Sequence, residues 1–354
     1  MVKQSLYLVF LVFLSFHSFS QKVTITIWKD SVIGAIYNKA THTVAYGKKD
    51  KNGVYKIYVS DTLGENEQAL TFPGWAKDRH QWAEEWHPSG KYLFCYVEKA
   101  EYVKEKGHKR SSIDAVPGYG AYTDLWLISR DGKNAWQLTN LPNNYSSGII
   151  HSAISPDGKK FAWSERIKEP KFTSKNLAAG AYVMRMADVV LDSVPHFENI
   201  KTYMPGNVLA ANELESISED HSIIYFYSTF ESKKLFQTPI YSLNVNNGEI
   251  KKLTEKSFAQ APSLTPNGKY IVYMTGEECD IFPFQLQGAD WWIMDTNGEN
   301  KRRLTYMNKK DHEHSVNKFR LAGSLSFMSD HSFLGGVMTK SLGLTGYTVK
   351  VVFE

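Results

Sequence analysis

The sequence has few cysteines and lacks the short motifs that mark several large enzyme classes. Among its 354 residues only Cys95 and Cys279 are cysteines, which is too few for a Cys-rich metal site. It contains no G-x-S-x-G nucleophile elbow, no P-loop and no G-x-G-x-x-G in a strand–helix setting. Residues 312–314, H-E-H, do not have the spacing of H-E-x-x-H. These absences argue against a serine-hydrolase domain, a nucleotide-binding domain and a zincin site.

A strong charge of one sign is also missing. The chain has 41 Lys and Arg residues against 37 Asp and Glu residues, a net charge of +4, and the two signs interleave throughout. Nucleic-acid binding needs a concentrated basic surface. The one dense basic run, residues 104–110, is interpreted as a solvated loop. We therefore expect no nucleic-acid partner.

Long hydrophobic runs are absent beyond the first 20 residues. Residues 6–16 are apolar, follow Lys3 and precede the small residues Ser18 and Ser20. The run is about half of the roughly 20 residues that a membrane-spanning helix needs, so a signal peptide fits it better than a membrane anchor. We predict that residues 1–20 are a signal peptide. The protein is then periplasmic or secreted, with no transmembrane anchor after signal removal.

What the sequence does contain is a repeat. Residues 151–165, HSAISPDGKKFAWSE, have the pattern of a strand, a tight turn and a second strand, because β-forming residues flank a Pro-Asp-Gly turn. The same register recurs at residues 84–98 and 261–275, in degenerate form at 215–229 and 324–339, and without the turn signature at 34–47. Such a period is typical of propellers and solenoids.

Each hairpin is followed by a second pair of strands joined by a polar turn. Clear copies lie at residues 55–71, 124–139, 240–254 and 290–305, and a weaker copy lies at 186–203. Six units of four strands then have about 55 residues each, against about 40–50 for a usual propeller blade. We predict an all-β fold in which residues 21–354 form a single six-bladed β-propeller of four-stranded antiparallel blades.

The two halves of the unit together resemble the PD40 repeat of TolB-like, WD40-like β-propellers. The resemblance is carried by the S-P-D-G-K turn at residues 155–159 and by the segment from D-L-W to L-T at residues 124–139. It covers nearly the whole chain after residue 20, and it implies a fold more than a function. TolB itself has an additional N-terminal domain, for which this chain has no room before its first blade.

The first strand is expected to close the ring. Residues 23–28 alternate with period two and have no hairpin partner nearby, whereas the sixth unit ends at residues 347–353 without a fourth strand. We predict that the N-terminal strand completes the last blade and leaves no unpaired inner edge; a frayed N-terminus is the alternative. Cys95 and Cys279 then lie in blades nearly opposite each other, too far apart for a disulfide, and are expected to be reduced.

Long connections gather on one face of such a ring, and binding sites usually lie on long loops. The turns within each hairpin are short and lie on the other face. Aromatic side chains on the long loops can stack on sugars or hold peptide side chains, although several could simply pack loop against loop. The predicted ligand-binding residues are Trp75, His80, Trp82, Glu84, Tyr119, Tyr122, Tyr145, His151, Phe284 and His314.

The innermost strands should line a central channel with His151 and several carboxylates near its upper end. Such a group could form a metal or acid–base site, or simply a polar channel filled with water. The PD40 resemblance includes oligogalacturonate lyases, in which channel histidines and a glutamine hold a divalent metal. It implies metal-ligand candidates, for a metal such as Mn or Ca, at His80, His151, Gln260 and His314. On the same reading the catalytic candidates are His151, His80 and Arg320.

These patterns favour a binding protein over an enzyme. We predict a non-catalytic scaffold without a cofactor, which holds an envelope or extracellular protein, peptide or glycan on its long-loop face. The alternative is a polysaccharide lyase or hydrolase with a metal- or His-based site at the central funnel. A structural subunit of an envelope assembly is a third reading, and it would expose an apolar patch.

Overall fold

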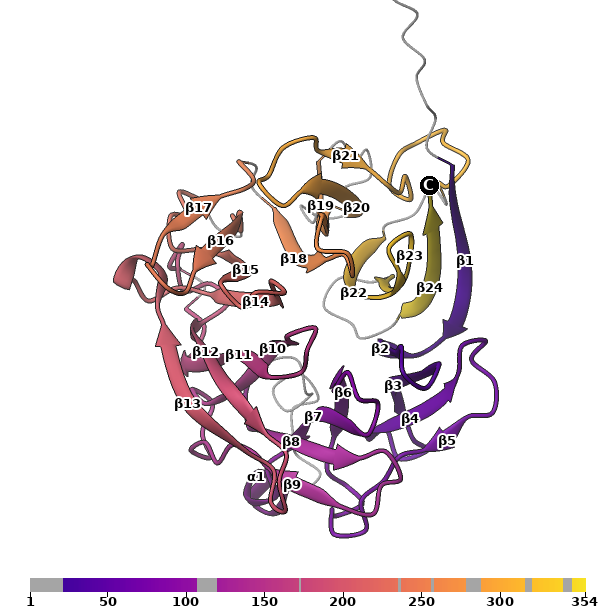
Figure 1. The fold of residues 1–354 in the computed structure, drawn as a ribbon, viewed down its shortest axis with the longest axis vertical. Helices are drawn as coiled ribbons and strands as arrows, with labels where there is room; N and C mark the ends of the chain where they lie inside the picture. Colours follow the sequence, from indigo (N-terminus) through magenta and orange to yellow (C-terminus); the bar gives the residue numbers. More distant parts are fainter. Residues whose placement is uncertain are drawn as a thin grey trace, which may run out of the picture.

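The computed structural model describes residues 22–106, 120–171, 173–234, 237–255, 258–277, 288–315, 320–339 and 346–354. Figure 1 shows its sheets arranged as a closed ring around a central axis. The ring contains six sheets, and each has four strands that pair with their neighbours. The fold is a six-bladed β-propeller, as the sequence repeat predicts.

Blades 1 to 3 take their strands in chain order, from the channel outward. Blade 1 consists of β2 (Ile33–Asn38), β3 (Thr43–Lys49), β4 (Tyr55–Asp61) and β5 (Gln68–Ala69). Blade 2 consists of β6 (Gln81–Trp86), β7 (Tyr92–Glu98), β8 (Thr123–Ser129) and β9 (Ala135–Gln137). Blade 3 consists of β10 (Gly148–Ile154), β11 (Lys160–Lys168), β12 (Ala181–Val190) and β13 (His196–Tyr203).

Blades 4 and 5 follow the same order, and blade 6 does not. Blade 4 consists of β14 (Asn212–Ile217), β15 (Ile223–Ser228), β16 (Ile240–Asn244) and β17 (Ile250–Lys252). Blade 5 consists of β18 (Ala259–Leu264), β19 (Tyr270–Thr275), β20 (Asp290–Asp295) and β21 (Arg302–Arg303). Blade 6 consists of β22 (Leu321–Ser329), β23 (Ser332–Met338), β24 (Gly346–Phe353) and, on its outside, β1 (Val23–Asp30).

Pairing of β1 with β24 closes the ring, as predicted. The two strands are antiparallel, and the register runs from Val23 opposite Phe353 to Asp30 opposite Tyr347. Val23 and Ile25 pack against the core that blades 5 and 6 share. The first and last described strands therefore belong to one sheet.

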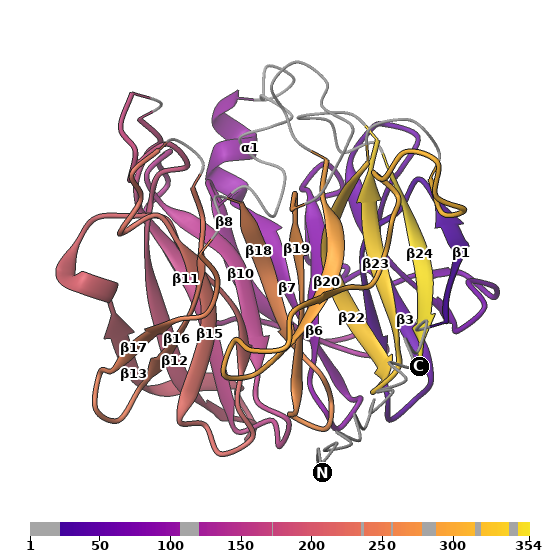
Figure 2. The same ribbon diagram turned by 90° about the horizontal axis from the view of Figure 1, so that it is seen from above.

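Helical structure is limited to short pieces in the connections. The helix α1 (Ala100–Lys106) lies between β7 and β8, and the 3-10 turn η2 (Pro205–Asn207) precedes β14. Figure 2 shows α1 standing on one face of the ring. No helical layer covers the blades in the described part of the chain, so the position of every site depends on the strands and their connections.

The hydrophobic core lies between neighbouring blades and not along the central axis. Phe94 of blade 2 stacks on Phe161 of blade 3 with ring centroids 4.2 Å apart, and Trp163 stacks on Phe197 at 5.0 Å. The rings of Phe94, Phe161 and Trp163 are almost completely inaccessible to solvent. The fold is stabilised by apolar side chains that pack between the blades. The residues that face the central axis can therefore be polar.

Buried aspartates anchor the connection that leaves the outermost strand of two blades. In blade 5, Asp290 accepts hydrogen bonds from the backbone N–H of Met307 at 2.7 Å and from Thr305 Oγ1 at 2.9 Å, and it pairs with Arg303 at 2.8 Å. In blade 2, Asp124 accepts from Leu141 N at 2.9 Å. These bonds satisfy backbone donors that lie beyond the sheet and fix the start of the long connections.

Candidate functional site

Every innermost strand has an irregularity in its pairing with the second strand of its blade. In β6, β10 and β14 the break in register leaves one residue out of the ladder: Glu84, His151 and Glu215, respectively. In β2, β18 and β22 it leaves out two residues, at positions 34–35, 261–262 and 323–324. A bulge of this kind bends its strand and redirects the side chain of the extra residue.

The six bulges surround the central axis, and the extra residues on one half of this ring have ionisable side chains. The extra residues of the adjacent blades 2, 3 and 4 are ionisable, whereas blades 1, 5 and 6 have Gly34, Ala261 and Gly323 in the equivalent segments. His151 and Gly34 both adopt left-handed backbone conformations, with φ of 49° and 58°. At Gly34 a Cβ atom would come within 2.8 Å of the Trp82 indole nitrogen, so a glycine keeps that wall open.

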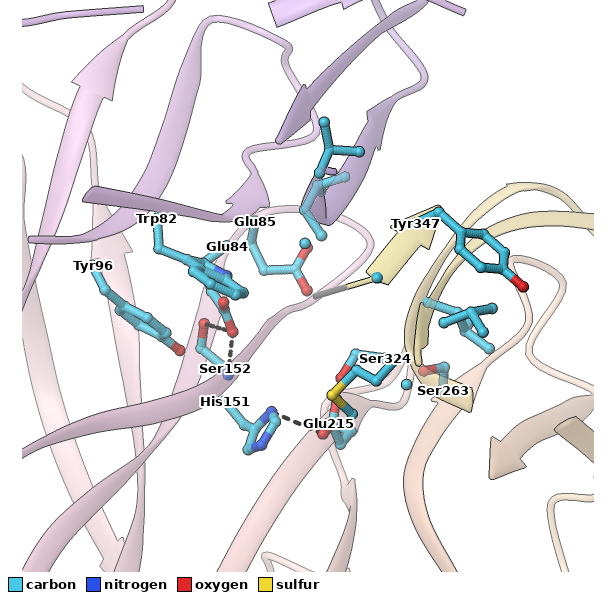
Figure 3. A pocket seen from close by; sticks show the side chains of 18 residues that line it. Trp82, Glu84, Glu85, Tyr96, His151, Ser152, Glu215, Ser263, Ser324 and Tyr347 are labelled. Carbon is cyan, nitrogen blue, oxygen red and sulfur yellow. Dashed lines mark hydrogen bonds and ion pairs between the residues drawn. The ribbon is translucent and has the colours of Figure 1, made fainter. Parts of the chain in front are cut away.

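A cavity of about 280 Å³ lies inside this ring. Figure 3 shows Glu84, Glu85 and His151 on one side of it and Tyr347 on the other side. Its lining residues include Val32, Met338 and Gly346, which lie at the strand ends on the long-loop side. The described residues that line it are Val32, Gly34, Ile36, Trp82, Glu84, Glu85, Tyr96, His151, Ser152, Glu215, Ser263, Gly323, Ser324, Leu325, Val337, Met338, Gly346 and Tyr347.

A second cavity, of about 350 Å³, lies at the short-turn end of the axis and is lined by Pro156, Pro266 and other turn residues. The described residues that line both cavities are Ile36, Glu85, Glu215, Ser263 and Leu325. They are therefore successive parts of one axial channel, with two carboxylates at the point where they meet.

His151 lies between two carboxylates. Its Nδ1 is 2.9 Å from Glu215 Oε1 and its Nε2 is 3.3 Å from Glu213 Oε2, while 24% of its side chain is exposed to the channel. Burial by itself lowers the pKa of His151, but Glu215 and Glu213 outweigh burial and hold the pKa well above its usual value. The Tyr227 hydroxyl donates to Glu213 Oε2 at 2.5 Å and fixes that carboxylate from behind.

Glu84 is held by the neighbouring blade. Its Oε1 accepts hydrogen bonds from the Ser152 backbone N–H at 2.9 Å and from Ser152 Oγ at 3.2 Å. Burial raises the pKa of Glu84, and His151 opposes that effect only in part, so the pKa is about 7. This carboxyl therefore changes its charge near neutral pH.

Glu85 and Tyr96 complete the polar wall. Burial, reinforced by Glu84 and Glu215, raises the pKa of Glu85 well above its usual value. Its carboxylate makes no hydrogen bond or ion pair with any residue that the structure describes. The Tyr96 hydroxyl is buried, and burial together with Glu84 raises its pKa. The wall thus concentrates groups that are costly to leave without a partner.

Three of the predicted ligand-binding residues line the cavity: Trp82, Glu84 and His151. Arg320 lies beside its rim, because its Nε donates to the hydroxyl of the lining residue Tyr347 at 3.1 Å. Gln260 lies in β18 and donates from Nε2 to Thr238 Oγ1 at 3.3 Å, outside the cavity lining. The channel thus brings together a subset of the predicted residues.

Two other predicted residues are buried in the protein. Trp75 is 6% exposed and packs edge-on against Trp126 at 5.6 Å, in the core between blades 1 and 2. His80 is 7% exposed, and its Nδ1 accepts a hydrogen bond from the Tyr55 backbone N–H at 3.0 Å. Neither side chain lines the axial cavity.

The remaining predicted residues lie on the connections. Tyr122 stacks on Tyr102 of α1 at 3.8 Å and lies 6.2 Å from Tyr145. His314 lies 5.0 Å from His312, which in turn stacks on Tyr306 at 4.1 Å. These clusters are separate from the cavity lining. Tyr119, Phe284 and Cys279 lie outside the described residues.

Among the described residues, no three His, Cys, Asp or Glu side chains are grouped so as to hold a metal ion. His151 is the one described histidine that lines the axial cavity, and the other metal candidates, His80, Gln260 and His314, do not line it. The divalent-metal alternative therefore has His151 and nearby carboxylates as its available donors in the described part of the chain.

Sequence reasoning missed several residues of the cavity. Glu85 directly follows the predicted Glu84 but would alternate to the opposite side in a regular strand; the bulge at Glu84 brings both to the channel. Tyr96, Ser152 and Tyr347 have no local signal that separates them from core or rim residues. The pairing of two adjacent glutamates before the first tight turn of a blade is the one signal that could have found Glu85.

The propeller is similar to solved structures. TolB from Acinetobacter baumannii matches with a TM-score of 0.51 at 16% sequence identity, over 90% of this chain and 65% of that chain. A protein from Agrobacterium tumefaciens designated as TolB matches with a TM-score of 0.52 at 17% identity, over 80% of this chain and 89% of the other. The fold is that of the TolB propeller. At these identities the likeness shows the fold alone.

Propellers of peptidases are similar to the same degree. A puromycin-hydrolyzing peptidase from Mycobacterium tuberculosis matches with a TM-score of 0.53 at 13% identity, over 90% of this chain but 42% of that chain. This chain thus spans 65% of the length of the Acinetobacter TolB and less than half of the peptidase. No family model and no curated protein matches the sequence. Among the described residues, no helix has the length and apolar character to span a membrane.

Proposed function

We propose that this TolB-like propeller is an exported, non-catalytic binding scaffold whose long-loop face holds a protein, peptide or glycan segment. The observation that carries this proposal is the axial cavity of about 280 Å³ at the long-loop end of the channel, with a polar wall on blades 2 to 4. A concave site with a few convergent polar groups on a rigid scaffold is the usual form of a ligand site. In this proposal the cavity takes the end or a side chain of the ligand.

The state of the polar groups favours binding over catalysis. His151 is engaged by two carboxylates, and a general base needs a nitrogen free to accept a proton. In this proposal the hydrogen-bonding groups and the apolar surface of the cavity orient a ligand without reacting with it. Lys3 and the apolar residues 6–16 support export, and an envelope or extracellular partner follows from export.

The direct test is capture from an envelope extract alongside a glycan array. Ser324 is exposed and lines the cavity, so Ser324→Trp should fill its mouth without disturbing the core. Ser193 is exposed in the turn between β12 and β13, and Ser193→Trp is the matched control. We expect the wild type and Ser193→Trp to retain the same protein or glycan, and Ser324→Trp to lose at least tenfold in affinity.

Two outcomes would overturn this proposal. Equal retention by Ser324→Trp would place binding away from the axial cavity. Turnover of polyuronates with added Mn or Ca, lost in Ser324→Trp and kept in Ser193→Trp, would replace the binding scaffold with the lyase alternative.

A further inference from the structure

Within the proposed binding function, on which this step rests, we infer that the ligand inserts a cationic group on an aliphatic stem into the axial cavity. A lysine or arginine side chain has this chemistry. The cation lies against the carboxylates of Glu84, Glu85 and Glu215, and the stem lies along the opposite, apolar wall. The inference specifies what the binding face recognises.

The first argument is the charge of the cavity wall. Glu84, Glu85 and Glu215 line the cavity, and His151 is the one lining side chain among the described residues that can be cationic. His151 already contacts Glu215 and Glu213. Glu84 and Glu85 thus lack an ion-pair partner within the described part of the chain. A carboxylate that is taken out of water without a cation is destabilised, and a bound cation relieves that cost.

The second argument is a buried polar group aimed into the cavity. Tyr96 is 1% exposed and lines the cavity. Its hydroxyl interacts with Glu84 and Ser152, but the geometry falls short of a normal hydrogen bond to either. Figure 3 shows Tyr96 beside Glu84 and Ser152 on the acidic wall. Buried hydroxyls almost always have partners. An ammonium or guanidinium group at this wall would donate to the Tyr96 oxygen as well as to the carboxylates.

The third argument is the shape of the opposite wall. Blades 1 and 6 contribute Val32, Ile36, Leu325, Val337 and Met338 there, and Gly34 and Gly323 leave space beside them. Lysine and arginine bury an apolar stem while their charged head stays in a polar environment. A cavity with one apolar and one acidic wall therefore matches a long cationic side chain better than a compact polar group.

Selection from a displayed library of random peptides tests this inference. The wild type should enrich peptides with lysine or arginine at one fixed position. Replacing that residue by norleucine in a synthetic copy of a selected peptide should weaken binding to the wild type at least tenfold in calorimetry. The double variant Glu84→Gln/Glu85→Gln should lose a similar factor. Glu169→Gln is the control, because Glu169 is exposed on the same face outside the cavity.

The outcomes separate this inference from the proposed function. Some selected peptides could lose affinity for Ser324→Trp, which places them in the cavity, and yet bind the wild type equally well with norleucine. That result would contradict the cationic group and would leave the proposed binding function unchanged. A wild type that retains no peptide and no glycan would overturn both. The norleucine comparison uses the wild-type protein alone, so it decides the matter even if the double variant folds poorly.

Discussion

At the residue scale, the axial site depends on where charges are paired and where they are not. His151 is surrounded by acceptors, whereas Glu85 has none of the donors that would match it among the described residues. The two groups differ because the bulge in β10 turns His151 toward β14, while β6 presents two consecutive glutamates to the channel. The chemistry of the site is thus set by single positions in the strand pairing.

Glu84 makes binding of a cationic peptide dependent on pH. Its pKa is about 7, so its carboxyl is largely neutral at pH 6 and largely ionised at pH 8. If the ionised form is required, affinity for the selected lysine or arginine peptide should rise roughly tenfold over that interval. Isothermal calorimetry at the two pH values measures this. The charged and titratable groups that face Glu84 are Tyr96 on β7, His151 on β10, Glu215 on β14 and Glu85 on its own strand.

Glu84→Gln is the control for this pH dependence. The variant removes the titration of Glu84 and keeps those of Glu85 and His151, whose pKa values are also raised above their usual values. We therefore expect the affinity of the variant to change less between the two pH values than the affinity of the wild type. An unchanged pH dependence in Glu84→Gln would show that another group is responsible.

The free energy of unfolding should fall as pH rises, whereas the affinity for the cationic peptide should increase. The folded chain holds the Glu84 proton up to about pH 7, whereas the unfolded chain releases it near the ordinary value of 4.5. Because the pKa of this acid is raised on folding, the free energy of unfolding falls as pH increases from 4.5 toward 7. Urea unfolding of the wild type and Glu84→Gln should give curves that diverge over this window, with the variant gaining at the higher pH. Parallel curves would contradict the assigned pKa.

At the scale of single elements, buried ion pairs fix the ends of the blades. Asp290 pairs with Arg303, and their side chains are 0% and 2% exposed. Asp290→Ala would leave Arg303 buried without that carboxylate and would free the Met307 backbone N–H. We expect a loss of about 3–5 kcal/mol in the free energy of unfolding, measured by urea titration.

The exposed pair Lys252–Glu255 provides the comparison for Asp290. Glu255 is 82% exposed, so Glu255→Ala should cost less than about 1 kcal/mol. Equal losses in the two variants would mean that burial does not distinguish these pairs.

Strands were predictable from the sequence, and bulges were not. The Pro-Asp-Gly turn at residues 156–158 and the β-forming residues on either side of it are local signals, and β10 and β11 follow them. The extra residue at His151 leaves no such signal, because its position depends on how the innermost strands curve around the axis. For this reason the sequence placed His151 and Glu84 at the channel but did not single out Glu85 or Tyr96.

Aromatic residues on connections were harder to assign. Trp75 and Tyr122 lie in long connections, as predicted, but Trp75 is in the core between blades 1 and 2 and Tyr122 stacks on α1. The sequence shows that a connection contains aromatic residues, but it does not show which residues their rings pack against. Trp75, in the connection between β5 and β6, packs against Trp126 in β8. These residues are about 50 positions apart, so no local pattern in the sequence relates them.

At the scale of the whole molecule, ring closure by β1 should control stability and association. Deleting β1 removes the packing of Val23 and Ile25 and exposes the edge of β24. From the burial of two partly buried side chains we expect a loss of about 3–5 kcal/mol, or roughly 5–10 °C in Tm. Differential scanning calorimetry checks the stability.

An open β24 edge should also promote pairing between molecules. Size-exclusion chromatography of the β1 deletion should therefore show dimers or larger species, whereas a chain beginning at Lys22 should not. A deletion variant that stays monomeric with an unchanged Tm would mean that blade 6 is complete with three strands.

The β1–β24 pairing also determines how the molecule would respond to force. Val23 lies directly opposite Phe353, so the two ends of the ladder leave the rim at the same point. A pull on both ends would open the hydrogen bonds one at a time, like a zipper, and would not load them all together. For the same reason a short peptide linker could join the two ends, and a circularly permuted chain could be opened at a tight turn elsewhere with the ring intact.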